Sequence, residues 1–423
     1  MDNILKKLMI SEKTRQETTL DLIPSENVAQ PEMLGILGSP LVNKYSEGYP
    51  GARYYPGNEF CDEIELLAKE RALSVFGVSG SLWNVNVQPY SGSPANQAIY
   101  FALARSGDTI MGLSLAHGGH LTHGHHVSFS GKQYRSNPYG VDLKSGLIDY
   151  DELKASAFDA KPKIIFSGSS AYPRQIDFEK IGSIAREVQA YHVADISHIA
   201  GLVATGLHPS PFPYADVVMT TMHKTLRGPR GAVIFSRNKD MSVQNENGDS
   251  EEHVKTISEA IDRAVFPGLQ GGPHNNVTAA IAWAFSEAMG KKFKSYMERV
   301  VKNAKVLSEE LSRLGFELIA GGTDTHLMLI NLKSLDIGGA DAEKMLEWSH
   351  ILANRNSIPG DAHPRKPSGI RLGTPSLTSR GMKEKEMKQV ALLIHRVLVG
   401  KETVKDEVKK LCKKFPLPYK GKV

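Results

Sequence analysis

The sequence predicts an α/β protein in which a mostly parallel sheet is covered by helices. Short apolar runs rich in β-branched residues at 163–166, 191–194 and 216–219 have the character of buried parallel strands. A helical stretch at 178–190 separates the first two, and a further strand is expected at 232–235. This alternation is typical of βαβ units, in which ligands bind beyond the carboxyl ends of the strands.

A helical arm is expected before the alternating strands and helices, and a smaller α+β domain is expected after them. Residues from about 21 to 60 are rich in Gly, Pro, Tyr and Asn and are expected to form irregular loops, and the polar insertion 238–252 is expected to be an exposed loop. The other expected elements are helices at 1–20, 95–105, 277–314, 382–398 and 403–413 and strands at 316–319 and 327–332. We therefore expect an arm (1–20), a large domain (21–275) and a small C-terminal domain (276–423).

Composition excludes several classes of protein. The net charge of +5 over 423 residues comes without a basic stripe interleaved with aromatic residues, so no nucleic-acid binding is expected. No apolar stretch is long enough for a membrane span, and residues 1–13 do not have the pattern of a signal peptide. The two cysteines, Cys61 and Cys412, argue against a disulfide framework and favour a cytoplasmic protein.

An amine and a carboxylate follow two of the predicted strands. Asp195 ends the run at 191–194, and Lys224 follows the run at 216–219. Pyridoxal phosphate needs both groups, because a lysine forms the Schiff base with its aldehyde and an acid keeps its ring nitrogen protonated. Most lysines are merely solvated, but Lys224 lies among small hydroxyl residues and precedes a Gly-Pro-Arg-Gly turn. We therefore interpret the pair as a pyridoxal phosphate site.

A candidate phosphate site lies at Ser91, Gly92 and Ser93, just before the predicted helix 95–105. Free N–H groups and the helix dipole favour an anion at a helix N-terminus. The alternative is an ordinary helix cap, for which serine is equally common.

Five histidines lie close together, at His117, His120, His123, His125 and His126. One interpretation is a metal site, which would make the chain a histidine-rich metal-binding protein. The intervening glycines break any single helical face, so we prefer an imidazole stacked on an aromatic cofactor and expect no metal. Glycines would let this loop approach the cofactor closely.

Together these motifs identify a resemblance to serine hydroxymethyltransferase, a family of fold-type-I pyridoxal phosphate enzymes. The resemblance extends over nearly the whole chain. Its motifs are Leu22–Asn27, Asn43–Pro50, Gly118–Gly124, Asp195–Leu202, Thr220–Gly231, Pro267–Pro273 and Ser368–Pro375. It implies reversible transfer of the serine hydroxymethyl carbon to tetrahydrofolate, which gives glycine and 5,10-methylenetetrahydrofolate.

The resemblance also implies roles for individual residues. Lys224 would form the Schiff base, Asp195 would pair with the ring nitrogen, and His198 would pair with the 3′-oxygen of the cofactor. His120 would stack on the ring, and Ser170 would lie beside it. The phosphate would be held by Ser91, Gly92, Ser93 and His223. Arg371 would bind the carboxylate of the amino acid through its fork of donors, with help from Ser25.

In this family, residues corresponding to Tyr45, Glu47, Tyr55 and Gly272 reach the active site of the neighbouring subunit. The resemblance therefore implies a homodimer as the minimum unit, with Glu47 as the proton-transfer group and Tyr55 as a further catalytic residue. Whether dimers pair into tetramers is left open. The folate co-substrate would contact Leu115, Gly119, Leu121 and Asn356.

Two segments depart from the family pattern. Residues 362–367 lack the usual Ser-Pro-Phe stretch, and Pro56 follows Tyr55 where glycines are usual. The altered loop motivates an alternative function, a folate-independent aldolase acting on 3-hydroxy amino acids such as allo-threonine, or an α-methylserine hydroxymethyltransferase.

Overall fold

The computed structural model describes residues 2–241, 256–361 and 366–419. Among these residues, seven strands form a central sheet in the order β4-β10-β9-β8-β7-β5-β6. The strands are β4 (Trp83–Asn86), β5 (Thr109–Met111), β6 (Arg135–Ser136), β7 (Ile164–Ser167), β8 (Tyr191–Asp195), β9 (Val217–Thr221) and β10 (Ala232–Arg237). The pairs from β9 to β6 are parallel, whereas β10 is antiparallel to β4 and β9. The predicted mostly parallel sheet is confirmed.

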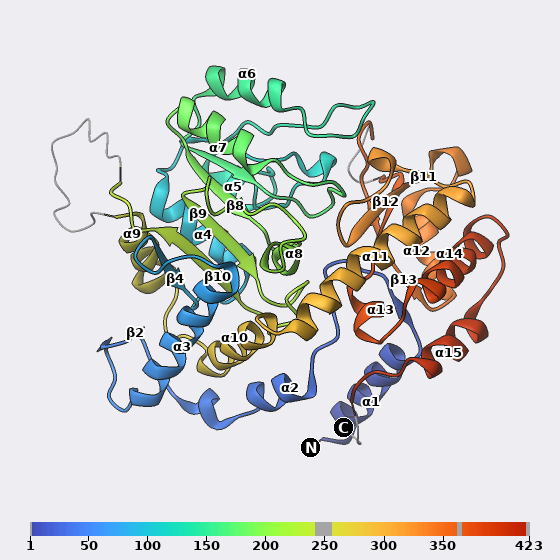
Figure 1. Cartoon of the computed structure of the whole chain (residues 1–423), viewed down its shortest axis with the longest axis horizontal. Helices are drawn as coiled ribbons and strands as arrows, with labels where there is room; N and C mark the ends of the chain where they lie inside the picture. Colours follow the sequence, from blue (N-terminus) through green and yellow to red (C-terminus); the bar gives the residue numbers. More distant parts are fainter. Residues whose placement is uncertain (1, 242–255, 362–365, 420–423) are drawn as a thin grey trace.

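Helices cover both faces of this sheet (Figure 1). Along β7, Ile164 and Phe166 belong to one hydrophobic core and Ile165 to another, because successive strand residues point to opposite faces. The first core is completed by α4 (Gly92–Leu103) and α9 (Ile257–Arg263), with the six-residue helix η3 (Ala264–Leu269) following α9. The second core is completed by α3 (Glu59–Phe76), α6 (Tyr150–Ala160), α7 (Phe178–Glu187), α8 (Ala200–Ala204) and α10 (Asn275–Ala288). Short helices η2 (Leu115–His117) and α5 (Phe129–Gln133) lie in the connections.

The N-terminal arm contains the predicted helix, α1 (Asn3–Glu17), which begins after Asp2, whose carboxylate accepts a hydrogen bond from the Leu5 N–H. The arm then pairs as β1 (Leu20–Asp21) with β13 (Ile351–Leu352). Figure 1 shows α1 beside α15 (Lys405–Lys414). The arm is therefore tied to the C-terminal part of the chain rather than to the central sheet.

The expectation of irregular loops from 21 to 60 is wrong in part, because α2 (Pro31–Leu37) lies within this segment. Pro31 stands at its first position, where a fixed φ and a missing N–H favour helix entry, and Met33 is buried. The segment also contains η1 (Pro40–Asn43) and the two-residue strands β2 (Gly48–Tyr49) and β3 (Ala52–Arg53), which pair with each other.

The C-terminal part has a four-stranded antiparallel sheet in the order β11-β12-β15-β14. Its strands are β11 (Glu317–Leu318), β12 (Leu327–Asn331), β14 (Asn354–Asn356) and β15 (Gly369–Gly373). Its helices are α11 (Lys291–Arg313), η4 (Ile319–Gly321), η5 (Lys333–Leu335), α12 (Gly339–Trp348), α13 (Pro375–Ser379), α14 (Glu384–Leu398) and α15 (Lys405–Lys414). The long helix predicted at 277–314 is two helices, because the chain turns through an extended Gly290 between α10 and α11.

The long helix α11 connects the two parts of the molecule (Figure 1). Its residues up to Val300 pack into the core of the central sheet, and those from Ala304 onward pack into a separate core around the small sheet. The division near residue 276 stays a prediction. Most of the predicted loop 238–252 lies outside the described residues, as does most of 362–367.

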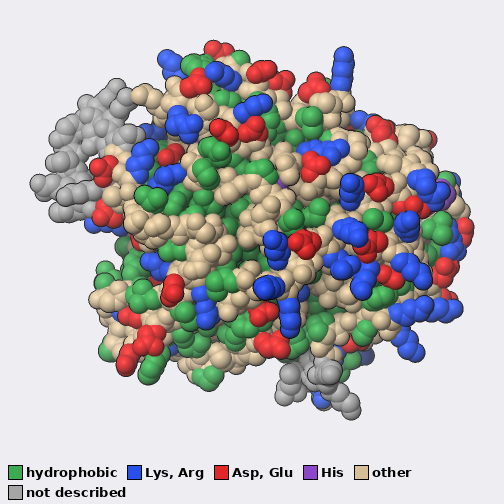
Figure 2. All heavy atoms as spheres, in the orientation of Figure 1, with side chains coloured by type: hydrophobic (Ala, Val, Ile, Leu, Met, Phe, Trp, Pro, Cys, Tyr) green, Lys and Arg blue, Asp and Glu red, His purple; other side chains and the backbone are tan. Residues whose placement is uncertain are grey.

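Acidic and basic side chains are interspersed over the face drawn in Figure 2. Within the described ranges, no helix combines the length and apolarity needed to cross a bilayer.

Candidate active site

Lys224 and Asp195 line one cavity at the carboxyl edge of the sheet. Asp195 is the last residue of β8, and Lys224 lies in the turn after β9, the neighbouring parallel strand. The cavity measures about 250 Å³. Its walls also include the predicted residues Ser91, Gly92, Ser93, His120, Ser170, His198 and His223. The parallel register of β8 and β9 thus brings the predicted amine and acid together.

Asp195 is held by two side chains that the sequence did not single out for it. The Nδ2 of Asn96 donates to Asp195 Oδ2 at 3.1 Å, and the Nε2 of His123 lies 3.2 Å from the same oxygen. The other carboxylate oxygen accepts the Ser197 N–H at 3.0 Å. Gly168 at the end of β7 allows this packing, since a Cβ there would lie 2.1 Å from the Asp195 carbonyl oxygen.

The charges in the cavity favour an ionised acid and a readily neutralised amine. Burial opposes ionisation of Asp195, but its hydrogen bond to His123 and the charge of Lys224 hold the pKa of its carboxyl well below the usual range. Burial lowers the pKa of the Lys224 ammonium to about 8, although the nearby Asp195 opposes this shift. At pH 7 about a tenth of Lys224 is therefore the free amine that can attack an aldehyde, far more than for an ordinary lysine.

The N-terminus of α4 opens into the same cavity. Ser91 occupies the cap position, yet its side chain makes no capping hydrogen bond. Gly92 lies close to the end of β9, because a Cβ on it would be 2.7 Å from Thr221 Cγ2. The buried Thr221 Oγ1 and His223 Nδ1 have no hydrogen-bond partner. These unpaired polar groups beside a helix N-terminus are suited to a phosphate, and the cap interpretation of Ser91 is not supported by a bond.

His120 reaches the cavity on a glycine-containing loop. Gly118 has a φ of +98° and its carbonyl accepts hydrogen bonds from the N–H groups of Ser170 and Ala171. A Cβ at Gly118 would lie 2.7 Å from the Ala171 carbonyl oxygen, so only glycine permits this close approach. Thr122 donates its N–H to His120 Nδ1 at 3.2 Å, which orients the ring. Burial lowers the pKa of the His120 imidazole to about 4, so the ring is neutral.

The other histidines of the cluster have separate partners. His117 Nδ1 accepts the Val141 N–H, His123 contacts Asp195, and the rings of His125 and His126 pack together at 4.2 Å. Across the described residues, no group of three or more His, Cys, Asp or Glu side chains is arranged to hold a metal ion.

A second histidine pair joins the cavity wall to the small sheet, because His198 lines the cavity and His326 packs behind it. His198 Nδ1 lies 3.3 Å from His326 Nε2, and their rings are stacked. Burial keeps the pKa of both imidazoles far below the usual value, to about 3 for His326. The His198 carbonyl accepts a hydrogen bond from Thr225, the residue after Lys224, which connects this pair to the lysine turn.

Arg371 approaches from the small sheet. It lies on β15 and is nearly buried, with Nε donating to Asn354 Oδ1 at 3.0 Å and Nη1 donating to the Ser170 carbonyl. Burial lowers the pKa of its guanidinium to about 10, so it stays charged at neutral pH. No carboxylate among the described side chains neutralises it. A fixed cation beside Ser170 is suited to an anionic substrate group.

A neighbouring cavity of about 450 Å³ contains the residues predicted for the co-substrate. Leu115, Gly119, Leu121 and Asn356 all line it. It shares His120 and Ser170 with the Lys224 cavity. Two substrates bound in the two cavities would therefore meet at these shared residues.

The other predicted residues do not line the Lys224 cavity of their own chain. Tyr45, Glu47, Tyr55 and Gly272 form a separate group: the Tyr45 and Tyr55 rings meet edge to face at 5.1 Å, and the Tyr45 ring packs against Gly272. Tyr45 and Tyr55 are about half exposed. Ser25 lines a third cavity of about 430 Å³, which shares His223 with the Lys224 cavity.

Sequence reasoning missed Asn96, His123 and His326 as partners inside the site. Asn96 could have been found from the sequence, because it stands four residues after Gly92 and so falls on the same face of α4. His123 was noted only as a member of the cluster. His326 had no signal, because its contact with His198 joins segments 128 residues apart.

Comparisons with known proteins agree with this geometry. A family model described as serine hydroxymethyltransferase matches residues 1–394. A protein from Caenorhabditis briggsae named serine hydroxymethyltransferase is 49% identical over 413 residues, which is 96% of this chain and 80% of that protein.

Proposed function

Because the chain belongs to the serine hydroxymethyltransferase family, it is a pyridoxal-phosphate-dependent transferase of serine–glycine and one-carbon metabolism, and we propose that the Lys224 cavity is its active site. The observation that carries the assignment is the meeting of Lys224, Asp195 and the α4 N-terminus in one cavity. The lysine amine, the acid and the unpaired donors match the aldehyde, the ring nitrogen and the phosphate of this cofactor.

The protein's own groups would hold the cofactor at three points. Lys224 Nζ would bind its aldehyde carbon, and the α4 N-terminus would bind its phosphate with Ser91, Ser93 and His223. Asp195, kept ionised by His123 and Asn96, would hold a proton at the ring nitrogen. Pyridoxal phosphate, when bound, supplies an electron sink for the charge left as the Cα–Cβ bond of serine breaks.

Other residues would hold the substrates. Arg371 would bind the serine carboxylate with the donors that remain beside its bond to Ser170, and Ser25 would assist. His120, neutral and oriented by Thr122, would pack on the cofactor ring. Tetrahydrofolate would occupy the cavity lined by Leu115, Leu121 and Asn356, which meets the first at His120.

The active unit is a homodimer in this proposal. Tyr45, Glu47, Tyr55 and Gly272 would complete the cavity of a second copy, with Glu47 moving a proton at the serine hydroxyl or at the folate. Support comes from their position outside their own cavity and from the exposure of both tyrosines. We place the enzyme in the cytoplasm, because Cys61 and Cys412 are both free.

A folate-dependence assay tests the function. Purified enzyme is incubated with L-serine, with and without tetrahydrofolate, and glycine is measured; we expect glycine only when folate is present. Equal glycine formation without folate would instead favour the 3-hydroxy amino-acid aldolase. A parallel reaction with α-methylserine tests the remaining alternative.

A further inference from the structure

The segment that carries Tyr45, Glu47 and Tyr55 has one side buried against the protein and one side that is more exposed. Ser46 and Gly48 are buried, while Tyr45 and Tyr55 are exposed and Glu47 is partly exposed. Burial alternates along residues 45–48, so that Ser46 and Gly48 face the protein and the side chains of Tyr45 and Glu47 are the more accessible ones. The contacts that hold the buried side of the segment therefore fix the positions of the side chains on its outward side.

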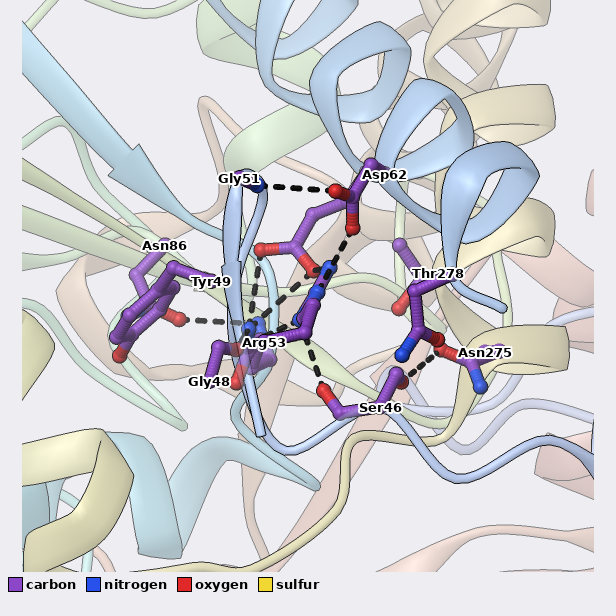
Figure 3. A network of polar contacts seen from close by, with 12 residues as sticks. Ser46, Gly48, Tyr49, Gly51, Arg53, Asp62, Asn86, Asn275 and Thr278 are labelled. Carbon is purple, nitrogen blue, oxygen red and sulfur yellow. Dashed lines mark hydrogen bonds and ion pairs between the residues drawn. The ribbon is translucent and has the colours of Figure 1, made fainter. Parts of the chain in front are cut away.

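Arg53 is the centre of that buried side (Figure 3). Its Nη1 donates to the carbonyl oxygens of Ser46 at 2.8 Å and Gly48 at 2.6 Å, the residues on either side of Glu47. Its Nε donates to Asp62 at 2.8 Å and its Nη2 to Glu65 at 2.7 Å, both on α3. The Arg53 side chain is only 4% exposed. One guanidinium thus ties the backbone around Glu47 to a rigid helix.

Further contacts secure the same backbone. Gln88 donates to both the Gly48 carbonyl and Glu65, and the Gly51 N–H donates to Asp62. Ser46 Oγ donates to Asn275 Oδ1 at 2.6 Å, where α10 begins. None of these bonds engages the carboxylate of Glu47.

We propose that Arg53 is a positioning residue for the transferase reaction: it holds the 46–53 segment so that Glu47 and Tyr55 project into the cavity of a second copy of this chain. The inference rests on the proposed sharing of sites between subunits. Arginine suits this task because its planar fork presents several donors in fixed directions, which a lysine ammonium does not. A shift of the segment by about 1 Å would move Glu47 out of proton-transfer reach and cost about 10²-fold in rate.

The first test is Arg53→Gln. We expect kcat to fall by about 10²-fold with a smaller change in serine KM, while the absorbance spectrum of the bound cofactor stays that of the native enzyme. Hydrogen exchange over 46–53 should rise and exchange over 191–226 should not. A native kcat, or equal loss of cofactor binding and kcat, would overturn the proposal.

The decisive test uses mixed dimers. A subunit carrying Arg53→Gln and one carrying Lys224→Ala are co-expressed with different tags, and the hybrid is purified. In the hybrid one site combines native Lys224 with native Arg53 from the other chain, so activity should return to about half of the native value. Persistence of the Arg53→Gln defect would mean that Arg53 acts on its own chain's site and would overturn the inference.

Two control hybrids separate the possible failures. Glu47→Gln paired with Lys224→Ala should recover activity in the same way. Asp195→Asn paired with Lys224→Ala should not, because each change lies in the cavity of its own chain and neither cavity of the hybrid is then intact. Recovery with Glu47→Gln but not with Arg53→Gln would refute the role of Arg53 and leave the sharing of sites intact. No recovery in either refutes the sharing of sites itself.

A milder variant covers the case in which Arg53→Gln does not fold. Asp62→Asn keeps the guanidinium and removes the charge of one of its partners, and Asp62 is partly exposed, so the fold should tolerate it. The same kinetics, exchange and hybrid assays then apply, with a smaller loss of kcat expected. An Asp62→Asn enzyme that exchanges faster over 46–53 yet keeps native kcat would contradict the positioning role.

Discussion

At the scale of single residues, the balance of burial and charge at Lys224 sets how it reacts. Burial lowers the pKa of its ammonium to about 8, and only the neutral amine attacks an aldehyde. We predict that cofactor-free enzyme captures pyridoxal phosphate at a rate that rises with pH, with a midpoint at about pH 8. Rapid-mixing absorbance measurements across pH give the midpoint.

Asp195→Asn provides the control for this midpoint. The negative charge of Asp195 favours the protonated lysine, so its removal should move the midpoint to lower pH. A midpoint near the ordinary lysine value of 10.5, or a shift in the opposite direction in Asp195→Asn, would contradict the environment described for Lys224.

The covalent role proposed for Lys224 has a direct chemical readout. We predict that borohydride reduction fixes the cofactor mass on native enzyme and not on Lys224→Ala, which also loses nearly all transferase activity. Lys180→Ala, on an exposed part of α7, serves as the control. Cofactor mass on the Lys224→Ala chain, or turnover at the native rate, would remove the central assignment.

Arg371 is predicted to act through geometry as well as charge. Arg371→Lys keeps a positive charge but loses the fork that reaches both Asn354 and Ser170. A charge-assisted hydrogen bond is worth about 1.5–3 kcal/mol, so we expect serine KM to rise by about 10- to 100-fold. Steady-state kinetics at saturating folate measure the change, and an unchanged KM would count against carboxylate binding by Arg371.

At the scale of elements, the site depends on how closely α4 approaches the end of β9. A methyl group at Gly92 would lie 2.7 Å from Thr221 Cγ2, so Gly92→Ala should push the helix N-terminus away and weaken cofactor binding. Overpacking of this kind costs about 1–3 kcal/mol. Thr221→Ser removes the clashing methyl and keeps the hydroxyl, so the double variant should recover much of the affinity.

A double-mutant cycle on cofactor Kd and on Tm tests this coupling. Gly35→Ala on α2 is the matched control, because no atom lies within 4 Å of a Cβ at that position. Strictly additive effects of Gly92→Ala and Thr221→Ser would show that the close contact between these two residues does not limit cofactor binding.

Some elements of the fold and the site could be predicted from the sequence, and others could not. The strands around Asp195 and Lys224 were predictable, because apolar β-branched runs and the right-handed crossover rule leave few arrangements for consecutive parallel strands. Helix α2 was missed because its glycine and flanking prolines resemble a loop. The contact between His198 and His326 could not be predicted from local pattern, because it depends on how two separate cores pack together.

At the scale of the whole molecule, the candidate site draws on both cores. Asp195 and Lys224 come from the central sheet, whereas Arg371 comes from the small one, and α11 contributes to both hydrophobic cores. A rotation of one part against the other about this helix would change the distance between Arg371 and the lysine. The amino-acid carboxylate and the cofactor aldehyde would therefore be held by different parts of the chain.

The arm provides the sharpest test of the proposed dimer. Helix α1 has no buried residue, yet Ile4, Leu5, Leu8, Met9 and Ile10 are exposed on it. Apolar side chains gathered on a helix favour contact with another surface, and a second copy is the partner that the proposed sharing of sites would require. Ile4→Glu and Leu8→Glu should weaken the dimer, each by about 1.5–3 kcal/mol, or about 10- to 100-fold in Kd.

Sedimentation over a range of protein concentrations measures this change, with activity followed in the same samples. Lys7→Glu also places a glutamate on α1, but at a residue that is already charged, so its dimer Kd should stay near the native value. Because Glu47 and Tyr55 would serve the other subunit, activity per chain should fall in step with the fraction of dimer. An Ile4→Glu, Leu8→Glu enzyme that is monomeric and fully active would show that one chain completes its own site, and the proposed exchange of Glu47 between subunits would then be wrong.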